Sequence, residues 1–160
     1  LWQYGKHPQN VMPELISQTH YLIGGKNDFE NCMGISETDD ARTHARVMRE
    51  FKNVQKIISV FRSTINASHQ SLYSTLFDGT DYLQSKKYDI YPVTDRVGAG
   101  DAFMAGLIYG ALSGADDQQA LDWGMASCAW KHTIEGDVSY ATADDLKKLM
   151  TGEGIGTLLR

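Results

Sequence analysis

Residues 95–103 carry the clearest structural signal in the sequence and read Asp95-Arg96-Val97-Gly98-Ala99-Gly100-Asp101-Ala102-Phe103. This stretch follows a short apolar segment, residues 89–93, that predicts a strand, and it opens a segment that predicts a helix over residues 100–112. Small residues at positions 98–100 let a ligand approach the backbone closely. The first N–H groups of a helix lack intrahelical partners and carry partial positive charge, so this strand-to-helix turn predicts a phosphate-binding loop.

Asp101 falls in the first turn of that predicted helix, beside the predicted anion site. The helix dipole favours the ionised form of a carboxylate in that position. Asp101 is therefore a candidate to accept or orient a hydroxyl proton during phosphoryl transfer. The alternative is a plain Gly-rich turn in which Asp101 only complements the dipole. The loop lacks the Gly-Lys-Ser/Thr ending of a Walker loop.

Around this turn the pattern predicts alternating strands and helices. Apolar runs at residues 21–23 and 56–61 predict buried strands, and Asp78-Gly79 between residues 71–77 and 80–83 predicts a hairpin. Helices are predicted at residues 13–16, from residue 27, and over 38–51, 117–132 and 142–150, with a glycine-rich tail at 152–160. This order predicts the α/β class, with a largely parallel sheet and an antiparallel edge.

Composition narrows the class of partner. The chain has 160 residues and a net charge of -5, and no more than two Lys or Arg residues are adjacent, which argues against nucleic acid or a membrane surface as partner. No apolar run reaches the roughly 18 residues of a membrane span. We interpret Cys32 and Cys128 as reduced thiols of a cytoplasmic protein. Because the chain begins Leu1-Trp2-Gln3 without Met, we expect it to be part of a longer protein.

The stretch from Asp95 to Phe103 is similar to the second signature of the ribokinase-like (PfkB) carbohydrate kinases. That signature is an Asp, two variable residues, then Gly/Ala-Ala/Gly-Gly-Asp-Thr/Ala-Phe. The resemblance implies a three-layer α/β/α ribokinase-like fold, of which residues 1–160 would form the C-terminal part. It also implies that Asp101 is the catalytic base and that the anion hole consists of Gly98, Ala99 and Gly100.

A second motif, Asn27-Asp28-Phe29-Glu30, resembles the Asn-x-x-Glu motif of the same family. The resemblance implies that Asn27 and Glu30 organise Mg²⁺ and phosphates through water, with no direct metal ligand. The alternative is structural only: Asn27 as the N-cap of a helix and Glu30 as its capping-box partner.

A third segment occupies the place of the family's nucleotide loop, often Thr-Leu-Gly-x-x-Gly, although here Arg62 and Ile65 replace both glycines. The resemblance implies nucleotide binding by residues 98–101 and by this segment, which consists of Val60, Phe61, Arg62, Ser63, Thr64 and Ile65. Arg62 is a candidate phosphate ligand because a guanidinium can bind a phosphate bidentately. The alternative is a solvated loop residue.

Residues 131–137, Lys-His-Thr-Ile-Glu-Gly-Asp, resemble the family's loop beside the nucleotide and the monovalent-cation region. Together with residues 95–101, and with the opening Leu1-Trp2, they are similar to the 2-dehydro-3-deoxygluconokinase branch. The resemblance implies that Asp137 faces the substrate, the alternative being a loop residue that ends a helix. We interpret His132 as a packing or capping residue. A monovalent cation is possible but is not predicted, because Val97 offers no side-chain oxygen.

The resemblance implies an ATP-dependent and Mg²⁺-dependent kinase that phosphorylates 2-dehydro-3-deoxy-D-gluconate to its 6-phosphate. It also implies a homo-oligomer for the full-length protein and an inactive chain when residues 1–160 stand alone. One alternative is another kinase of the family, such as a fructokinase, a ribokinase or a nucleoside kinase. The other is a non-catalytic nucleotide-binding fragment.

Overall fold

The computed structural model describes residues 5–152, and the chain divides into two compact units. The first unit holds the chain up to Val60 together with Leu76–Tyr82, and the second holds Phe61–Thr75 and the chain from Leu83 onward. The Leu1-Trp2 pair and residues 153–160 of the predicted tail lie outside the described residues.

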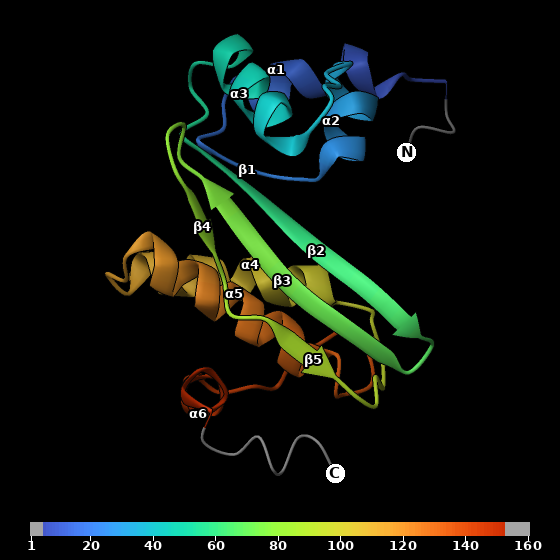
Figure 1. Ribbon diagram of the computed structural model, residues 1–160, viewed down its shortest axis with the longest axis vertical. Coiled ribbons are helices and arrows are strands. Elements are labelled where there is room, and N and C mark those ends of the chain that lie inside the picture. Colours follow the sequence, from blue (N-terminus) through green and yellow to red (C-terminus); the bar gives the residue numbers. More distant parts are fainter. Residues whose placement is uncertain (1–4, 153–160) are drawn as a thin grey trace. The chain divides into compact units, whose positions relative to one another are not determined.

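The chain contains both helices and strands, and the strands between Lys56 and Ile90 follow one another with helices before and after them (Figure 1). Their order is η2 (Pro8–Asn10), α1 (Met12–Ile16), β1 (Tyr21–Ile23), α2 (Lys26–Met33), α3 (Asp40–Glu50), β2 (Lys56–Asn66), β3 (His69–Phe77), β4 (Tyr82–Gln84), β5 (Tyr88–Ile90), α4 (Ala99–Leu112), α5 (Asp117–Lys131) and α6 (Ala143–Thr151). The predicted α/β class is confirmed.

The strands form one sheet with the order β1-β2-β3-β4, and β5 also pairs with β3. β1 runs parallel to β2, with Tyr21 opposite Lys56, and β5 runs antiparallel to β3, with Ser71 opposite Asp89. The antiparallel edge was predicted. The prediction that β1 is buried was wrong: Tyr21 is 47% exposed, because among the described residues β1 has a neighbouring strand on one side only.

β2 is longer than predicted and runs to Asn66. The prediction of a nucleotide loop at residues 60–65 was therefore wrong as to its structure, since these residues are strand. The segment contains no Gly or Pro and is rich in β-branched and aromatic residues, which favour a strand. Phe61 stacks on Tyr73 of β3 with ring centroids 4.9 Å apart. A tight turn joins the two strands, and in it the Ser68 N–H donates to Oδ1 of Asn66 at 2.9 Å.

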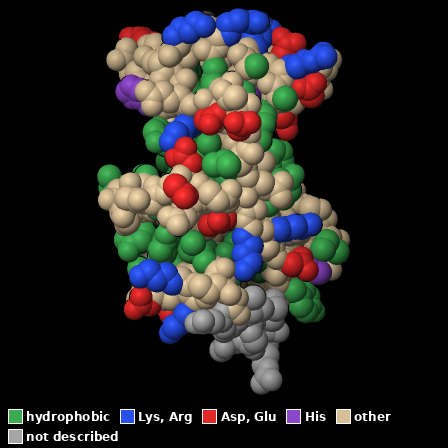
Figure 2. Space-filling view, turned by 60° about the vertical axis from the view of Figure 1, so that its left-hand side comes forward, with side chains coloured by type: hydrophobic (Ala, Val, Ile, Leu, Met, Phe, Trp, Pro, Cys, Tyr) green, Lys and Arg blue, Asp and Glu red, His purple; other side chains and the backbone are tan. Residues whose placement is uncertain are grey.

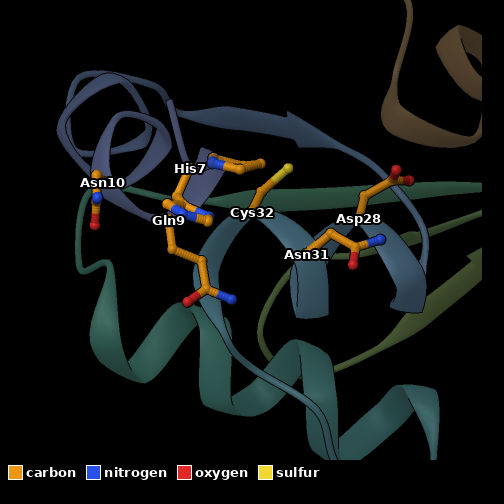
Figure 3. A pocket seen from close by; sticks show the side chains of 7 residues that line it. His7, Gln9, Asn10, Asp28, Asn31 and Cys32 are labelled. Atoms are coloured by element: carbon orange, nitrogen blue, oxygen red, sulfur yellow. The ribbon is translucent and has the colours of Figure 1, made fainter. Parts of the chain in front are cut away.

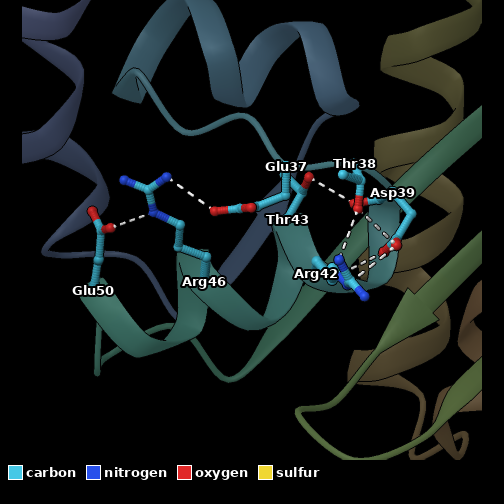
Figure 4. Close-up of polar contacts among 7 residues, drawn as sticks. All are labelled: Glu37, Thr38, Asp39, Arg42, Thr43, Arg46 and Glu50. Atoms are coloured by element: carbon cyan, nitrogen blue, oxygen red, sulfur yellow. Dashed lines mark hydrogen bonds and ion pairs between the residues drawn. The ribbon is translucent and has the colours of Figure 1, made fainter.

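The first unit has an apolar core between its helices and the start of β2. The core consists of Ile16, Phe29, Ile35, Val47, Val54 and Ile57. α3 begins two residues later than predicted, at Asp40, because Oδ1 of the N-cap Asp39 accepts from the Arg42 N–H at 2.8 Å (Figure 4). Further along the helix the Arg46 guanidinium lies between Glu37 and Glu50, with N–O distances of 3.1 and 2.8 Å. Both ion pairs are partly exposed, so they contribute little to stability.

The second unit is built on the close packing of α4 against α5. A Cβ at Gly106 of α4 would lie 2.5 Å from the backbone oxygen of Trp123 and 2.8 Å from Cβ of Ser127, both on α5. Because glycine has no Cβ, Gly106 permits α4 and α5 to pack this closely. The α4 helix starts one residue earlier than predicted, and α5 ends one residue earlier.

Candidate functional site

The N-terminus of α4 has the geometry of an anion-binding turn. Gly98 is the N-cap and has a φ of 75°, in the left-handed region that favours glycine. Its carbonyl oxygen accepts the first intrahelical bond, from the Ala102 N–H at 2.8 Å. The N–H groups of Gly100 and Asp101 precede that bond in the helix, where no intrahelical carbonyl can reach them. Gly100 is exposed, and a Cβ at this position would meet no atom within 4 Å, so a ligand has room to approach.

Asp101 lies in the first turn of α4 as predicted, and it is exposed. Among residues 5–152, no hydrogen bond or ion pair of its carboxylate is observed. The carboxylate is therefore available to a ligand at the helix N-terminus, next to N–H groups that attract an anion. The geometry is compatible with both the base role and the dipole-complementing role.

The turn before α4 packs directly against the loop that contains Asp137. A Cβ built on Gly98 would overlap the carbonyl oxygen of Asp137 and would lie 2.7 Å from its carbonyl carbon. Position 98 therefore requires glycine for two reasons, its φ and this backbone contact. The contact brings residues 98–101 and the backbone of Asp137 together, while the Asp137 side chain is exposed.

Asp95 connects the same two loops through its carboxylate. Oδ1 accepts from the backbone N–H groups of Arg96 and Val97 at 2.6 and 3.0 Å, and Oδ2 accepts from the Gly136 N–H at 2.9 Å. These bonds lower the pKa of Asp95, with the Val97 N–H as the largest cause and the positive charge of Lys131 as a smaller one. The residues alone did not reveal the link to Gly136. An Asp at the start of a turn is a recognisable sequence signal for hydrogen bonds from the backbone N–H groups of the next residues. It does not predict a bond from a distant residue such as Gly136.

The C-terminus of α5 supplies two buried basic side chains to this region. Lys131 is fully buried and its Nζ donates to the carbonyl oxygen of Ile134 at 3.0 Å. His132, also buried, donates from Nδ1 to the Cys128 carbonyl at 2.8 Å. Burial lowers the pKa of His132, and the nearby charges of Arg62, Arg96 and Lys131 lower it further. His132 is thus a neutral packing and capping residue, as interpreted from the sequence.

Two arginines lie on the side of this region formed by β2 and β3. The Arg96 guanidinium donates to the carbonyl of Ala67 at 2.9 Å. Gln70 is completely buried and, with its amide turned so that Oε1 faces the guanidinium, accepts from Nε of Arg96 at 2.6 Å. Arg62 is exposed, and its charge acts on both Cys128 and His132.

Asn27 and Glu30 lie in the first unit, on α2, and both are exposed. The capping interpretation of this pair was wrong: the N-cap is Gly25, and its N–H donates to Oδ2 of Asp28 at 2.8 Å. Asp28, rather than Glu30, is the residue three positions into the helix, so its carboxylate reaches the cap. Neither the Asn27 nor the Glu30 side chain makes a hydrogen bond to the other residues that the structure describes.

A pocket of about 590 Å³ is lined in part by α2 (Figure 3). Its lining consists of His7, Pro8, Gln9, Asn10, Asp28, Asn31 and Cys32. Burial raises the pKa of the Cys32 thiol, so this thiol is not activated as a nucleophile. Neither Asn27 nor Glu30 lines the pocket. Within residues 5–152, no three His, Cys, Asp or Glu side chains gather in a way that could hold a metal ion.

On the face shown in Figure 2, several Lys and Arg side chains lie next to one another at the top of the view, and elsewhere Lys and Arg lie among Asp and Glu. None of the helices within residues 5–152 is both long and apolar enough to cross a membrane.

Comparison with known proteins gives a consistent result. The sequence model of the pfkB family carbohydrate kinases matches residues 2–141. The structure of 2-dehydro-3-deoxygluconokinase from Thermotoga maritima is similar to 91% of this chain, with 31% sequence identity and a TM-score of 0.81. A segment of 62 residues, 39% of the chain, is 32% identical to 2-dehydro-3-deoxygalactonokinase from Haloferax volcanii and covers 20% of that protein.

A more distant structure shares the fold. Ribokinase from Arabidopsis thaliana, complexed with ribose and ATP, is similar to 86% of this chain with 20% identity and a TM-score of 0.61. The chain spans 45% of the Thermotoga maritima kinase and 42% of this ribokinase. It thus corresponds to less than half of either structure.

Proposed function

This chain belongs to the pfkB family of carbohydrate kinases, and from that premise we propose that it forms the phosphate-binding and catalytic-base part of an ATP-dependent sugar-acid kinase. The observation that carries the proposal is the N-terminus of α4. There a positive-φ Gly98 precedes unpaired helix N–H groups, and the exposed carboxylate of Asp101 lies in the same first turn.

Asp101 is the proposed base. Its carboxylate takes the proton of the substrate hydroxyl as that oxygen bonds to the γ-phosphorus of ATP, and the bond from phosphorus to the β–γ bridging oxygen breaks to release ADP. Gly98, Ala99 and Gly100 form the proposed anion hole, because their backbone lies where α4 presents its positive end. Fixed N–H dipoles aimed at developing charge supply much of the catalysis in this class of reaction.

The remaining site residues are proposed from the family motifs together with their chemistry. We propose that residues 60–65 and 98–101 bind the nucleotide. Within the strand segment we favour Arg62, an exposed cation whose charge reaches the end of α5. Asp137 is the proposed substrate residue, since its backbone abuts Gly98.

Asn27 and Glu30 are the proposed Mg²⁺ and phosphate network. Their exposed oxygens on one helix suit a cation that keeps most of its waters and binds few protein ligands. When bound, Mg²⁺ neutralises phosphate charge during transfer. The two side chains would hold its waters, which is compatible with the absence of a three-ligand cluster among the described residues.

The proposed substrate is 2-dehydro-3-deoxy-D-gluconate, phosphorylated at its 6-hydroxyl. The 31% identity to the Thermotoga maritima enzyme supports this choice. The Haloferax volcanii relative acts, by its name, on the galactonate counterpart, which makes that epimer the closest competitor. A panel of both sugar acids, fructose, ribose and adenosine, assayed with ATP and the intact gene product, separates these substrates. Highest kcat/KM for any compound other than 2-dehydro-3-deoxy-D-gluconate contradicts the substrate assignment.

Replacing Asp101 tests the base. In the intact protein, Asp101→Asn should reduce kcat by about 10²–10⁴-fold, because a general base contributes about that much. Asp144→Asn is the matched control, since Asp144 also lies in the first turn of a helix, α6, and is exposed. A loss of less than about tenfold for Asp101→Asn would exclude the base role. No turnover by the intact wild type with any sugar of the panel would instead favour a non-catalytic nucleotide-binding module.

A further inference from the structure

Two loops border the N-terminus of α4, and they are held together by more than packing. The first, residues 94–98, precedes α4, and the second, residues 131–137, follows α5. The Thr94 N–H donates to the carbonyl of His132 at 2.8 Å. The Gly136 N–H donates to Oδ2 of Asp95 at 2.9 Å. Gly98 then abuts the backbone of Asp137. Any loosening between the loops would therefore shift the residues that begin α4.

Asp95 is the side chain that couples the two loops. One oxygen fixes the turn ahead of Gly98 by accepting from the Arg96 and Val97 N–H groups, and the other accepts across the gap from Gly136. A carboxylate can do this because it only accepts, with two oxygens and several lone pairs. An amide in the same place would present a donor to one of these N–H groups.

Lys131 is a buried cation that the proposed reaction does not use. Its side chain is fully buried, and its Nζ donates to the Ile134 carbonyl at 3.0 Å, closing the start of the second loop. Burying an ammonium is costly unless opposite charge compensates it. Two such charges are present: the negative end of α5, where Lys131 is the last residue, and the carboxylate of Asp95.

We propose that Asp95 clamps residues 94–98 to residues 131–137, that Lys131 holds the second loop in shape through its bond to Ile134, and that together they position the N–H groups of Gly100 and Asp101 for phosphate binding. Both are positioning residues and neither touches the reacting atoms. The proposal rests on the proposed function in one respect only, the identity of the phosphate ligand as ATP.

The test compares Asp95→Asn and Lys131→Met with a matched control, Asp145→Asn. The Asp145 carboxylate accepts a backbone N–H of Thr142 at 2.9 Å in the same unit but belongs to the α6 cap.

Amide hydrogen exchange in the intact protein is followed at Thr94, Ala99 and Gly136. In the wild type, Thr94 and Ala99 donate to backbone carbonyls, so their rates report the loops rather than the replaced side chain. We expect both clamp variants, and not the control, to accelerate exchange at Thr94 and Ala99 by about tenfold or more.

A second measurement is the Kd for ATP with Mg²⁺ by titration calorimetry. It should rise about tenfold in both clamp variants, because small misplacement of binding groups is costly. A loss of folded protein lowers the number of sites but leaves Kd unchanged. Lys131→Arg, which keeps the charge, should bind ATP more tightly than Lys131→Met.

Unchanged exchange at Thr94 and Ala99 in both clamp variants would overturn the proposal. So would faster exchange accompanied by an unchanged Kd for ATP. If the intact wild type binds no ATP, the proposed function fails, and the exchange rates still decide whether the clamp exists.

Discussion

At the scale of single residues, Gly98 and Gly100 serve the same turn for different reasons. Gly98 has a φ of 75°, and a Cβ there would overlap the Asp137 carbonyl. Gly98→Ala should therefore lower the free energy of unfolding by about 1–3 kcal/mol, because the left-handed conformation and the overlap both oppose it. Urea unfolding of the intact protein measures this. A variant as stable as the wild type would contradict the backbone conformation described here.

Gly100→Ala should have the opposite effect on stability. Nothing lies within 4 Å of its added Cβ, and Ala is better than Gly within a helix by about 0.5–1 kcal/mol. If the backbone of residues 98–100 lies against a phosphate, the same methyl group obstructs the ligand. We expect a variant that is as stable as the wild type or more so, with a Kd for ATP at least about tenfold higher, or 1.4 kcal/mol. Unchanged affinity would exclude close backbone contact at this position.

At the scale of elements, the pairing of α4 with α5 depends on Gly106. Adding a methyl group there places it 2.5 Å from the Trp123 backbone oxygen, and neither helix backbone can yield locally. Gly106→Ala should therefore destabilise the protein by about 1–3 kcal/mol, as overpacking does. Gly100→Ala, the same substitution on the same helix, is the control. Equal midpoints for the two variants in urea would show that α4 and α5 are not closely packed.

The sequence predicted the bounds of some helices and strands more accurately than those of others. The helix α6 was located within one residue and α3 within two, because their starts depend on local N-cap chemistry at Thr142 and Asp39. The same reasoning failed at α2, where Asn27 and Gly25 both suit an N-cap and the backbone selects Gly25. The second half of β2 was missed because the family's loop resemblance outweighed a local β pattern.

Contacts between distant residues were the part of the site that the sequence could not predict. The residues of the α4 turn follow from motif chemistry, since helix N-termini bind anions wherever they occur. The bond from Gly136 to Asp95 joins positions 41 apart, and the burial of Lys131 depends on the whole of the second unit. No local pattern encodes either. Such contacts arise from tertiary packing, which also decided that β1 is half-exposed.

At the scale of the whole molecule, one titratable histidine is buried in each unit. In the first unit, His44 is 1% exposed, and its Nδ1 is hydrogen-bonded to the Tyr82 hydroxyl at 2.7 Å. Burial raises the pKa of Tyr82 to about 12, so this hydroxyl stays protonated. In the second unit, His132 is 3% exposed. Burial lowers the pKa of both histidines, so both are neutral in the folded protein near neutral pH.

This arrangement predicts that stability falls on mild acidification. At a pH above about 6.5, the pKa of a histidine in an unfolded chain, the two histidines are neutral in both the folded and the unfolded protein. Their protonation then costs no stability. As the pH falls below that value, the unfolded chain takes up protons that buried His44 and His132 do not, and unfolding becomes easier. The urea midpoint should therefore decrease between about pH 7.5 and about pH 5.5, a range in which carboxylates titrate little. The variant with His44→Gln and His132→Gln should lose part of this decrease, although it is less stable at neutral pH. An equally steep decrease of the urea midpoint in the double variant and the wild type would show that other groups cause it. The control is His7→Gln, which replaces an exposed histidine.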